Sequence, residues 1–150
     1  MTGSRRWENY QTIYNILESL WREFRRMAYS QDYPIGRFTV VEGGCATGAD
    51  LWARDWVRLH SIRTWHDQVA SETFAANWTV NGLQAGPMRN SAMVASGVDL
   101  CLAFMRPNSR GTMDCVTKAI KAGIPTHIFH ETEEVDWRLP ANTPALRSAS

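Results

Sequence analysis

The stretch from Arg37 to Asp50 constrains the fold more than any other part of the chain. It contains a β-branched and aromatic run from Phe38 to Val41, then three glycines, then a helix-period pattern that opens at Ala49. The order strand, glycine loop, helix is typical of a phosphate site, because glycines allow a tight turn whose amides face a ligand and the helix N-terminus adds partial positive charge. The loop is neither the dinucleotide fingerprint G-x-G-x-x-G nor a Walker loop, since no Lys-Ser or Lys-Thr follows Gly48.

Apolar periodicity predicts that helices and strands alternate along the chain. An amphipathic helix is expected over Tyr10 to Phe24, where apolar residues recur at three- and four-residue spacing. The elements expected after the glycine loop are a helix from Ala49, a strand at Ile62 to Trp65 or near Glu72 to Phe74, a helix over Met88 to Ala95, a strand over Val98 to Phe104, a helix over Met113 to Ala122 and a strand over Ile124 to Phe129. This alternation predicts an α/β fold, a Rossmann-like open parallel sheet with helices on both faces. The first strand is expected to be truncated, because Met1 stands directly before the loop at Thr2.

Length and composition bound the domain organisation. At 150 residues the chain has the size of one domain, which we assign to residues 1–130, with residues 131–150 as a C-terminal tail. Lys and Arg number 16 against 15 for Asp and Glu, so the net charge of +1 gives no reason to expect a nucleic-acid partner. No apolar run is long enough for a membrane span and no signal-peptide stretch follows Met1, so we expect a cytoplasmic protein without a membrane partner.

The cysteines and histidines do not indicate a metal site. Cys45, Cys101 and Cys115 are an odd number of thiols without C-x-x-C spacing, and we expect them to be reduced. His127 and His130 lie near the end of a strand at a spacing that does not put two ligands on one face. Neither a metal nor a cofactor is therefore expected.

Three loops rich in glycine, serine, threonine or arginine are expected at one edge of the sheet. They span Thr2 to Arg6, Gly43 to Asp50 and Arg106 to Thr112, and each follows an expected strand. In an open parallel sheet, ligands bind beyond the carboxyl ends of the strands. One glycine-rich loop is commonly only a turn, whereas three at the same edge form a cradle for a ligand.

Several short motifs occur in a fixed order over roughly Thr2 to Phe129. They are Thr2-Gly3-Ser4-Arg5, Glu42 to Asp50, Ala76-Asn77-Trp78, Gly82, Ala85 to Asn90, and Ser109-Arg110-Gly111-Thr112. Together they resemble the YspA-like, cpYpsA-related branch of the SLOG superfamily. Proteins of this superfamily have a Rossmann-like fold and are regarded as binders of nucleotides or of nucleotide-derived molecules such as ADP-ribose relatives. The resemblance implies a small bacterial or phage member with a phosphate-binding loop and a nucleotide-derived ligand.

Carried over position by position, the resemblance implies a ligand site built from the three loops and one helix. The residues implied to bind the ligand are Gly3, Ser4 and Arg5 in the first loop, Gly43, Gly44, Gly48 and Asp50 in the second, Arg89 and Asn90 on the helix after Pro87, and Arg110, Gly111 and Thr112 in the third. Asp50 would contact a ribose hydroxyl or cap its own helix. Arginine suits this task because its planar guanidinium can hold a phosphate through two hydrogen bonds.

The candidate catalytic residues come from a departure from a more distant resemblance. Related phosphoribohydrolases carry a Gly-Gly-x-Gly-Thr-x-x-Glu loop whose Glu acts in glycosidic-bond cleavage, and the matching position here is Cys115. Catalysis would then fall to Asp114, one residue earlier, or to Glu42 at the end of the central strand. Glu42 has a second interpretation, as the structural partner of Arg89 or Arg110.

The leading hypothesis is a domain that binds a nucleotide-derived small molecule, a nucleotide or an ADP-ribose-like compound, as a sensor or sequestering module. One alternative is a phosphoribohydrolase-like enzyme that hydrolyses the N-glycosidic bond of such a ligand. A second alternative is a nucleic-acid or protein interaction module that keeps the fold without a small molecule. Tryptophan-rich helices and the habits of the resembled family favour a homo-oligomer, located in the host cytoplasm if a phage encodes the chain.

Overall fold

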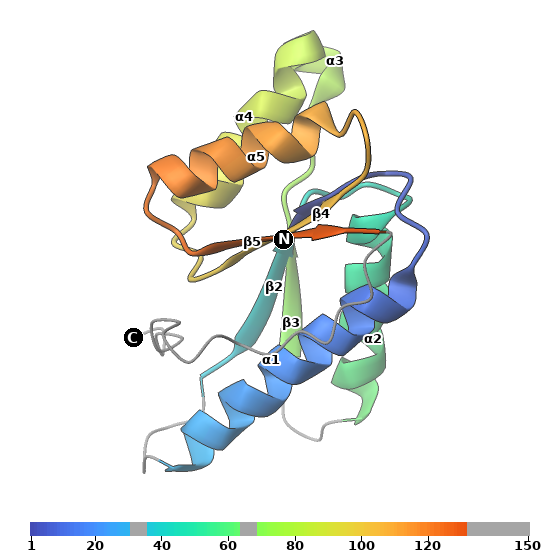
Figure 1. Cartoon of the computed structure of the whole chain (residues 1–150). Coiled ribbons are helices and arrows are strands. Elements are labelled where there is room, and N and C mark those ends of the chain that lie inside the picture. Colours follow the sequence, from blue (N-terminus) through green and yellow to red (C-terminus); the bar gives the residue numbers. More distant parts are fainter. Residues whose placement is uncertain (31–35, 64–68, 132–150) are drawn as a thin grey trace.

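The computed structural model describes residues 1–30, 36–63 and 69–131, and its helices and strands alternate along the chain (Figure 1). The strands are β1 (Thr2–Gly3), β2 (Phe38–Glu42), β3 (Val69–Thr73), β4 (Cys101–Met105) and β5 (Thr126–His130). The helices are α1 (Tyr10–Ser30), α2 (Ala49–Arg63), α3 (Trp78–Asn81), the 3-10 helix η1 (Gly82–Gln84), α4 (Ala85–Ala95) and α5 (Arg110–Lys121). From residue 132 on, the predicted C-terminal tail lies outside the described residues.

Every strand pairing in the described part of the chain is parallel. β4 pairs with β1 on one side and β5 on the other, with Thr2 opposite Ala103, and β2 pairs with β3. The Met1 nitrogen donates to the Val41 carbonyl, which brings the start of β1 beside β2. The strands thus form two parallel ladders, β1-β4-β5 and β2-β3, and this hydrogen bond places them side by side with β2 next to β1, as in a Rossmann-like fold. The predicted fold class is confirmed.

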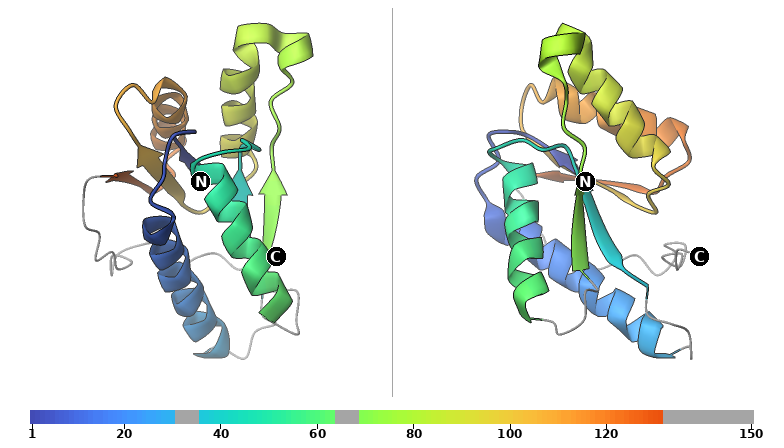
Figure 2. Two further views of the ribbon diagram at one scale, coloured as in Figure 1. Left: turned by 90° about the vertical axis from the view of Figure 1, so that its right-hand side faces the viewer. Right: turned by 180° about the vertical axis from the view of Figure 1, so that it is seen from behind.

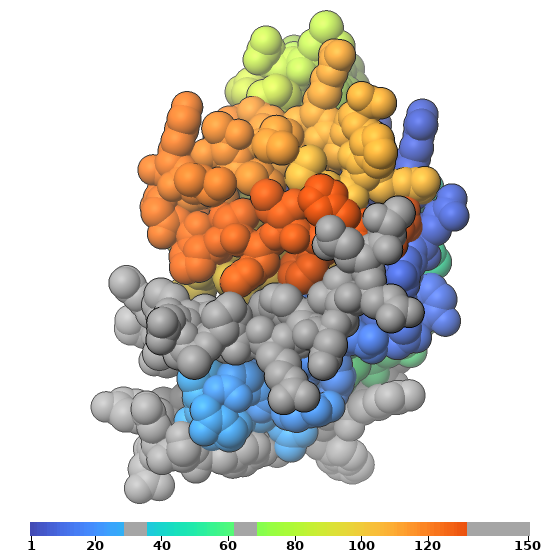
Figure 3. Space-filling view, in the orientation of Figure 1, coloured from blue at the N-terminus to red at the C-terminus, as the bar shows by residue number. Residues whose placement is uncertain are grey.

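Helices cover both faces of the strands, as Figures 1 and 2 show. α1 packs on α2 on one side, and α4 packs on α5 on the other. Space-filling atoms of α5 and β5 lie together at the surface on the face seen in Figure 3. The apolar side chains that are almost completely enclosed between α1, α2 and the strands include those of Trp7, Ile13, Ile16, Leu17, Trp56 and Phe104. Since the first helix buries one stripe of its surface, its predicted amphipathic pattern is confirmed.

β1 is very short, as predicted, and it passes close to the start of α2. A Cβ atom at Gly3 would overlap the Cβ of Ala49 and touch Phe104 on β4. Glycine is therefore required there by close packing. This contact fixes the loop after β1 beside the N-terminus of α2. None of the described helices is long and apolar enough to cross a membrane.

The predicted bounds were wrong at several later elements. β3 corresponds to the second of the two predicted positions but begins earlier, at Val69, whereas Ile62 belongs to the end of α2. The other proposed end, Trp65, lies outside the described residues. β3 was hard to predict because, after Val69, its residues are partly or fully exposed and carry no apolar run.

The last two helices begin earlier than predicted, and the last two strands begin later. α4 starts at Ala85 instead of Met88, so Pro87 lies inside the first turn, where its missing N–H is tolerated. α5 starts at Arg110 instead of Met113. β4 begins at Cys101 instead of Val98, and β5 begins at Thr126 instead of Ile124.

Candidate functional site

The first and second predicted loops meet at the carboxyl ends of β1 and β2. The Ser4 amide continues the pairing of β1 with β4 by donating to the Phe104 carbonyl at 2.9 Å. The Ser4 carbonyl then accepts the amide of Ala49, the first residue of α2, at 3.2 Å. Gly48 lies directly against the backbone of Ser4 and Arg5. Gly3, Ser4 and Gly48 are thus explained first by packing between the two loops.

The backbone conformation of the second loop depends on two glycines. Gly44 has φ +75° and Gly48 has φ +69°, values that side-chain-bearing residues rarely adopt. A Cβ atom at Gly48 would overlap the Ser4 carbonyl oxygen and lie 2.6 Å from the Arg5 carbonyl carbon. The loop can therefore close against the first loop only with glycine at this position.

Two loop amides that were expected to face a ligand donate instead to carboxylates of the chain. The Gly44 amide donates to Glu42 Oε2 at 2.6 Å, and the Cys45 amide donates to Asp50 Oδ2 at 3.1 Å. Asp50 is buried, and its carboxylate binds the loop backbone. The tip of the loop, Ala46 and Thr47, is exposed, and its amides have no hydrogen-bond partner among the described residues. An anion would meet the loop at this tip.

Glu42 is enclosed, with 0% of its surface exposed. Its side chain accepts hydrogen bonds from the Gly44 amide, from Thr73 Oγ1, and from Arg54 Nη1 at 2.6 Å. The interpretation that Glu42 pairs with Arg89 or Arg110 was wrong, because the first turns of α2 bring Arg54 closer. This placement gives Glu42 a structural role and leaves a ligand no route to it.

Arg54 is a site residue that the sequence interpretation missed. It pairs with Glu42 and also donates to the Cys45 carbonyl, so it braces the glycine loop from α2. A signal was present, because Arg54 follows the loop-facing Asp50 by one helical turn, and residues four apart share a helix face.

α4 connects the second loop to the third. Arg89 donates through Nη1 to the Gly43 carbonyl and through Nε to Asn90 Oδ1 at 2.9 Å. Asn90 is buried and donates through Nδ2 to the Gly111 carbonyl at 3.0 Å and to Asp114 Oδ2 at 2.9 Å. Asn90 is therefore a bridge between α4 and α5, and the guanidinium of Arg89 lies beside the glycine loop.

The third loop places Arg110 and Gly111 at the surface and Thr112 in the interior. Arg110 is the first residue of α5, and its guanidinium has no partner among the described residues. Arg106, at the start of the same loop, donates to the Arg6 carbonyl and so spans the gap between the loops after β4 and β1. The three predicted loops are thus brought together, with Thr112 as a packing residue.

Asp114, the candidate catalytic residue on α5, is hydrogen-bonded to other side chains of the protein. Asp114 accepts hydrogen bonds from Lys118 Nζ at 2.7 Å and from Asn90. Burial raises the pKa of the Asp114 carboxyl, but the two hydrogen bonds and the Lys118 charge outweigh it and the net shift is downward. Cys115, at the position that matched the glutamate of the phosphoribohydrolases, is buried and hydrogen-bonded to Cys101. Asp114 is therefore a carboxylate at neutral pH, and Asn90 and Lys118 hold it by hydrogen bonds.

Some arginines of the described residues pair with carboxylates and others do not. Ion pairs with carboxylates join Arg26 to Glu23, Arg54 to Glu42, Arg58 to Asp55, and Arg106 to Glu131. Arg5, Arg89 and Arg110 make no such pair within the described ranges, and Arg5 lies 5.6 Å from the centre of the Trp78 ring. Three arginines without a carboxylate partner among the described residues therefore lie near the carboxyl ends of the strands.

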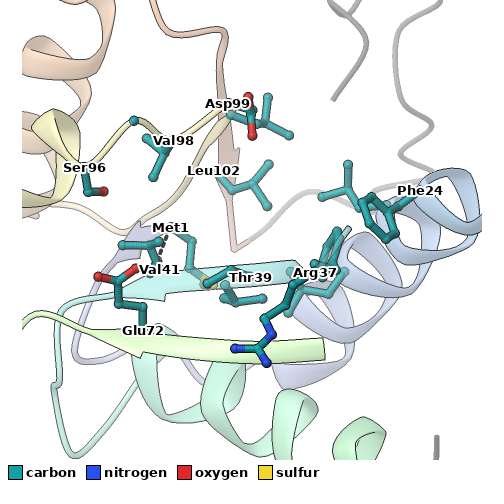
Figure 4. Close-up of a pocket in the computed structure, with 16 residues that line it drawn as sticks. Met1, Phe24, Arg37, Thr39, Val41, Glu72, Ser96, Val98, Asp99 and Leu102 are labelled. Atoms are coloured by element: carbon teal, nitrogen blue, oxygen red, sulfur yellow. Dashed lines mark hydrogen bonds between the residues drawn. The ribbon is translucent and has the colours of Figure 1, made fainter. Parts of the chain in front are cut away.

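A cavity of about 330 Å³ lies elsewhere, between β2, α1 and the segment before β4. Figure 4 shows Val98 and Leu102 on one side of it and Thr39 and Val41 on the other. Its charged lining residues are Arg37, Glu72 and Asp99, and the remaining lining is mostly apolar. None of the predicted ligand residues lines this cavity, and an apolar lining does not suit a phosphate.

One relative gives the chain a family. The gene 61 protein of Mycobacterium phage D29 is 38% identical to this chain over 129 residues, which cover 86% of this chain and 93% of that protein. No protein-family model matches the chain. No solved structure matches it. Because the name of the relative states no activity, a functional conclusion has to rest on the site.

Proposed function

The chain belongs to the family of the gene 61 protein of Mycobacterium phage D29, and we propose that it binds a nucleotide-derived small molecule at the three loops. The protein would act as a sensor or a sequestering module. One observation carries the proposal: Arg5, Arg89 and Arg110 lie around the loops, and none of them pairs with a carboxylate among the described residues, whereas Arg54 and Arg106 at the same loops do. The anionic part of such a ligand would supply the missing counter-charge.

The backbone around these arginines supports an anion. α2 and α5 direct their N-termini, which carry partial positive charge, toward the carboxyl ends of β2 and β4. The exposed amides of Ala46 and Thr47 lie at the tip of the loop that leads into α2. The nearby acids do not repel an anion strongly, because Glu42 is paired with Arg54 and Asp50 is bound to a loop amide. Free amides and helix N-termini therefore face this end of the sheet, where the carboxylates of Glu42 and Asp50 already have partners.

The test is ligand binding by the wild-type protein and two charge-matched variants. Purified protein is incubated with AMP, ADP-ribose, NAD and cyclic ADP-ribose isomers, and binding is followed by thermal shift and by mass spectrometry of bound and free fractions. Arg110→Ala should weaken the binding of an active compound by roughly 10- to 100-fold, because a charged hydrogen bond is lost. Lys121→Ala removes the same charge from the far end of α5 and should leave affinity unchanged. Wild-type affinity in Arg110→Ala, or no binding of any compound, would contradict the proposal.

Hydrolysis of the N-glycosidic bond is the alternative function. Glu42 is enclosed by three hydrogen bonds, and the Asp114 carboxylate is bound by Lys118 and Asn90. These placements support binding over cleavage. The same mass spectrometry distinguishes the two, since an enzyme would release free base and ribose phosphate, and Asp114→Asn would then abolish the products.

Self-association is proposed through the exposed apolar side chains of α3, η1 and α4. Val80, Leu83 and Met88 are exposed apolar side chains on α3, η1 and α4. Apolar residues gathered in this way favour a contact with a second copy of the chain. Light scattering of purified protein measures the oligomeric state, and a monomer at high concentration would contradict self-association. An interaction module without a small molecule predicts no binding in the ligand panel.

A further inference from the structure

Trp78 is unusual among the tryptophans that the structure describes. Trp7, Trp21 and Trp56 are buried in the core, and Trp52 is half-buried against Tyr10, whereas Trp78 is 49% exposed. An indole ring carries a large apolar area, so leaving half of it in water is unfavourable unless the ring has a partner. The exposed ring is therefore a candidate contact surface.

Two features define the position of Trp78, namely the cap of α3 at Asn77 and the close approach of α4 at Gly86. Asn77 caps α3 through its side-chain oxygen, which accepts the Val80 amide at 3.1 Å, and its carbonyl accepts the Asn81 amide at 3.0 Å. A Cβ atom at Gly86 would lie 3.3 Å from Trp78 Cη2, so the edge of the ring passes close to the start of α4. The capped backbone and the close approach of α4 restrict the positions open to the ring, which lowers the entropy cost of binding a ligand there.

Trp78 is linked to the proposed anion site by two contacts. The Arg5 guanidinium lies 5.6 Å from the centre of its ring, and the Arg5 backbone touches Gly48 of the glycine loop. The segment from β3 to Trp78 also passes the glycine loop, since a Cβ atom at Gly44 would lie 3.6 Å from the Cα of Ala75. Arg5 therefore stands between an aromatic platform and the tip of a phosphate loop.

We propose that the aromatic base of the ligand stacks on Trp78. Arg5 would contact both this base and the phosphate at the glycine loop. The inference rests on the proposed function and names its ligand class as base-bearing nucleotides rather than sugar phosphates. Every nucleobase has a π face, and stacking on an aromatic side chain contributes about 1–3 kcal/mol per base. A base on Trp78 would also cover apolar ring area that is now in water.

The test compares two probes that differ only in the base, AMP and ribose 5-phosphate, by isothermal titration calorimetry. Wild-type protein should bind AMP more tightly than ribose 5-phosphate by roughly 5- to 150-fold, the affinity ratio that corresponds to one stacked base. Trp78→Ala should remove this preference and leave ribose 5-phosphate affinity unchanged, and Trp78→Phe should retain part of it. Leu83→Ala, which removes an exposed apolar side chain from the neighbouring η1, is the control and should keep the wild-type preference.

The outcomes separate this inference from the proposed function. Equal affinity of the wild-type protein for both probes, or an unchanged AMP preference in Trp78→Ala, would overturn the stacking platform and leave the anion site standing. No binding of either probe would overturn both. If Trp78→Ala and Leu83→Ala shift the oligomeric state together and not the AMP preference, Trp78 belongs to a protein interface instead. Circular dichroism confirms that each variant is folded.

Discussion

Two regions of the molecule could hold a ligand, and they differ in their lining. One is the end of the sheet where the three loops meet, called the loop end here, and the other is the cavity beside α1. At the loop end, the carboxylates of Glu42, Asp50 and Asp114 are all bound within the protein. The cavity has a volume of about 330 Å³ and a mostly apolar lining. The difference shows that the size of a void does not identify an anion site. Cationic side chains without carboxylate partners and free backbone donors are the better guide to such a site, and they are the reason for proposing one at the loop end.

The two regions also contribute to stability in different ways. The loop end is held by hydrogen bonds and by glycines that permit close backbone contacts, so a substitution there acts through strain or through an unpaired charge. Around the cavity, stability depends on dispersion contacts and on apolar surface removed from water. Substitutions at the loop end should therefore change stability and binding together, whereas substitutions around the cavity should change stability alone.

The largest effect is expected for Gly48→Ala. The new Cβ atom would overlap the Ser4 carbonyl oxygen, and φ at this position is +69°. Strain and displacement of the first loop should lower the free energy of unfolding by on the order of 4 kcal/mol and abolish ligand binding. Urea denaturation measures the first effect and calorimetry with AMP the second. Gly111→Ala is the control for stability, because nothing lies within 4 Å of its Cβ position; a similar loss there would contradict the packing explanation.

The second-largest effect is expected from breaking the ion pair between Glu42 and Arg54. Glu42→Gln removes the charge that Arg54 faces, while the 0% exposure of Glu42 prevents water from replacing it. The free energy of unfolding should fall by about 3 kcal/mol, since breaking a buried pair leaves an uncompensated charge. The double variant Glu42→Gln, Arg54→Met should lose less than the sum of the two single variants. Additive losses would show that the pair is not coupled.

Around the cavity, Leu102→Ala and Val98→Ile form an opposed pair of substitutions. Leu102 is buried at the cavity wall, and its truncation should cost about 3 kcal/mol, because the void becomes larger. Val98→Ile fills part of the void and should stabilise the fold by up to about 1 kcal/mol. Neither variant should change AMP affinity when the folded protein is titrated. A change in affinity with Val98→Ile would assign the cavity to the ligand site.

Sequence patterns were sufficient for elements whose signals are local. The apolar stripe of α1 and the strand, glycine loop and helix from Phe38 onward occur as predicted. The meeting of the three loops followed from the rule that ligand loops lie at the carboxyl ends of parallel strands. Spacing places Arg54 on the same helix face as Asp50, but the choice of Arg54 over Arg89 by Glu42 also depends on how α2 leaves the loop. That direction is set by the contact of Gly48 with Ser4, which no spacing reveals.

The smallest effect concerns pH and the Asp114 carboxylate at the edge of the loop end. Its folded-state pKa is lowered, since the hydrogen bonds from Lys118 and Asn90 outweigh burial. A lowered pKa contributes stability that is present above the unfolded pKa of about 3.9 and is lost as pH falls through the folded pKa. With the side chain 35% exposed, solvent limits this contribution to below about 1 kcal/mol. Asp114→Asn should therefore be less stable than wild type at pH 6, and the difference should shrink as the pH falls below about 4. A difference that stayed constant over this range would mean that Asn90 and Lys118 hold the side chain regardless of its charge.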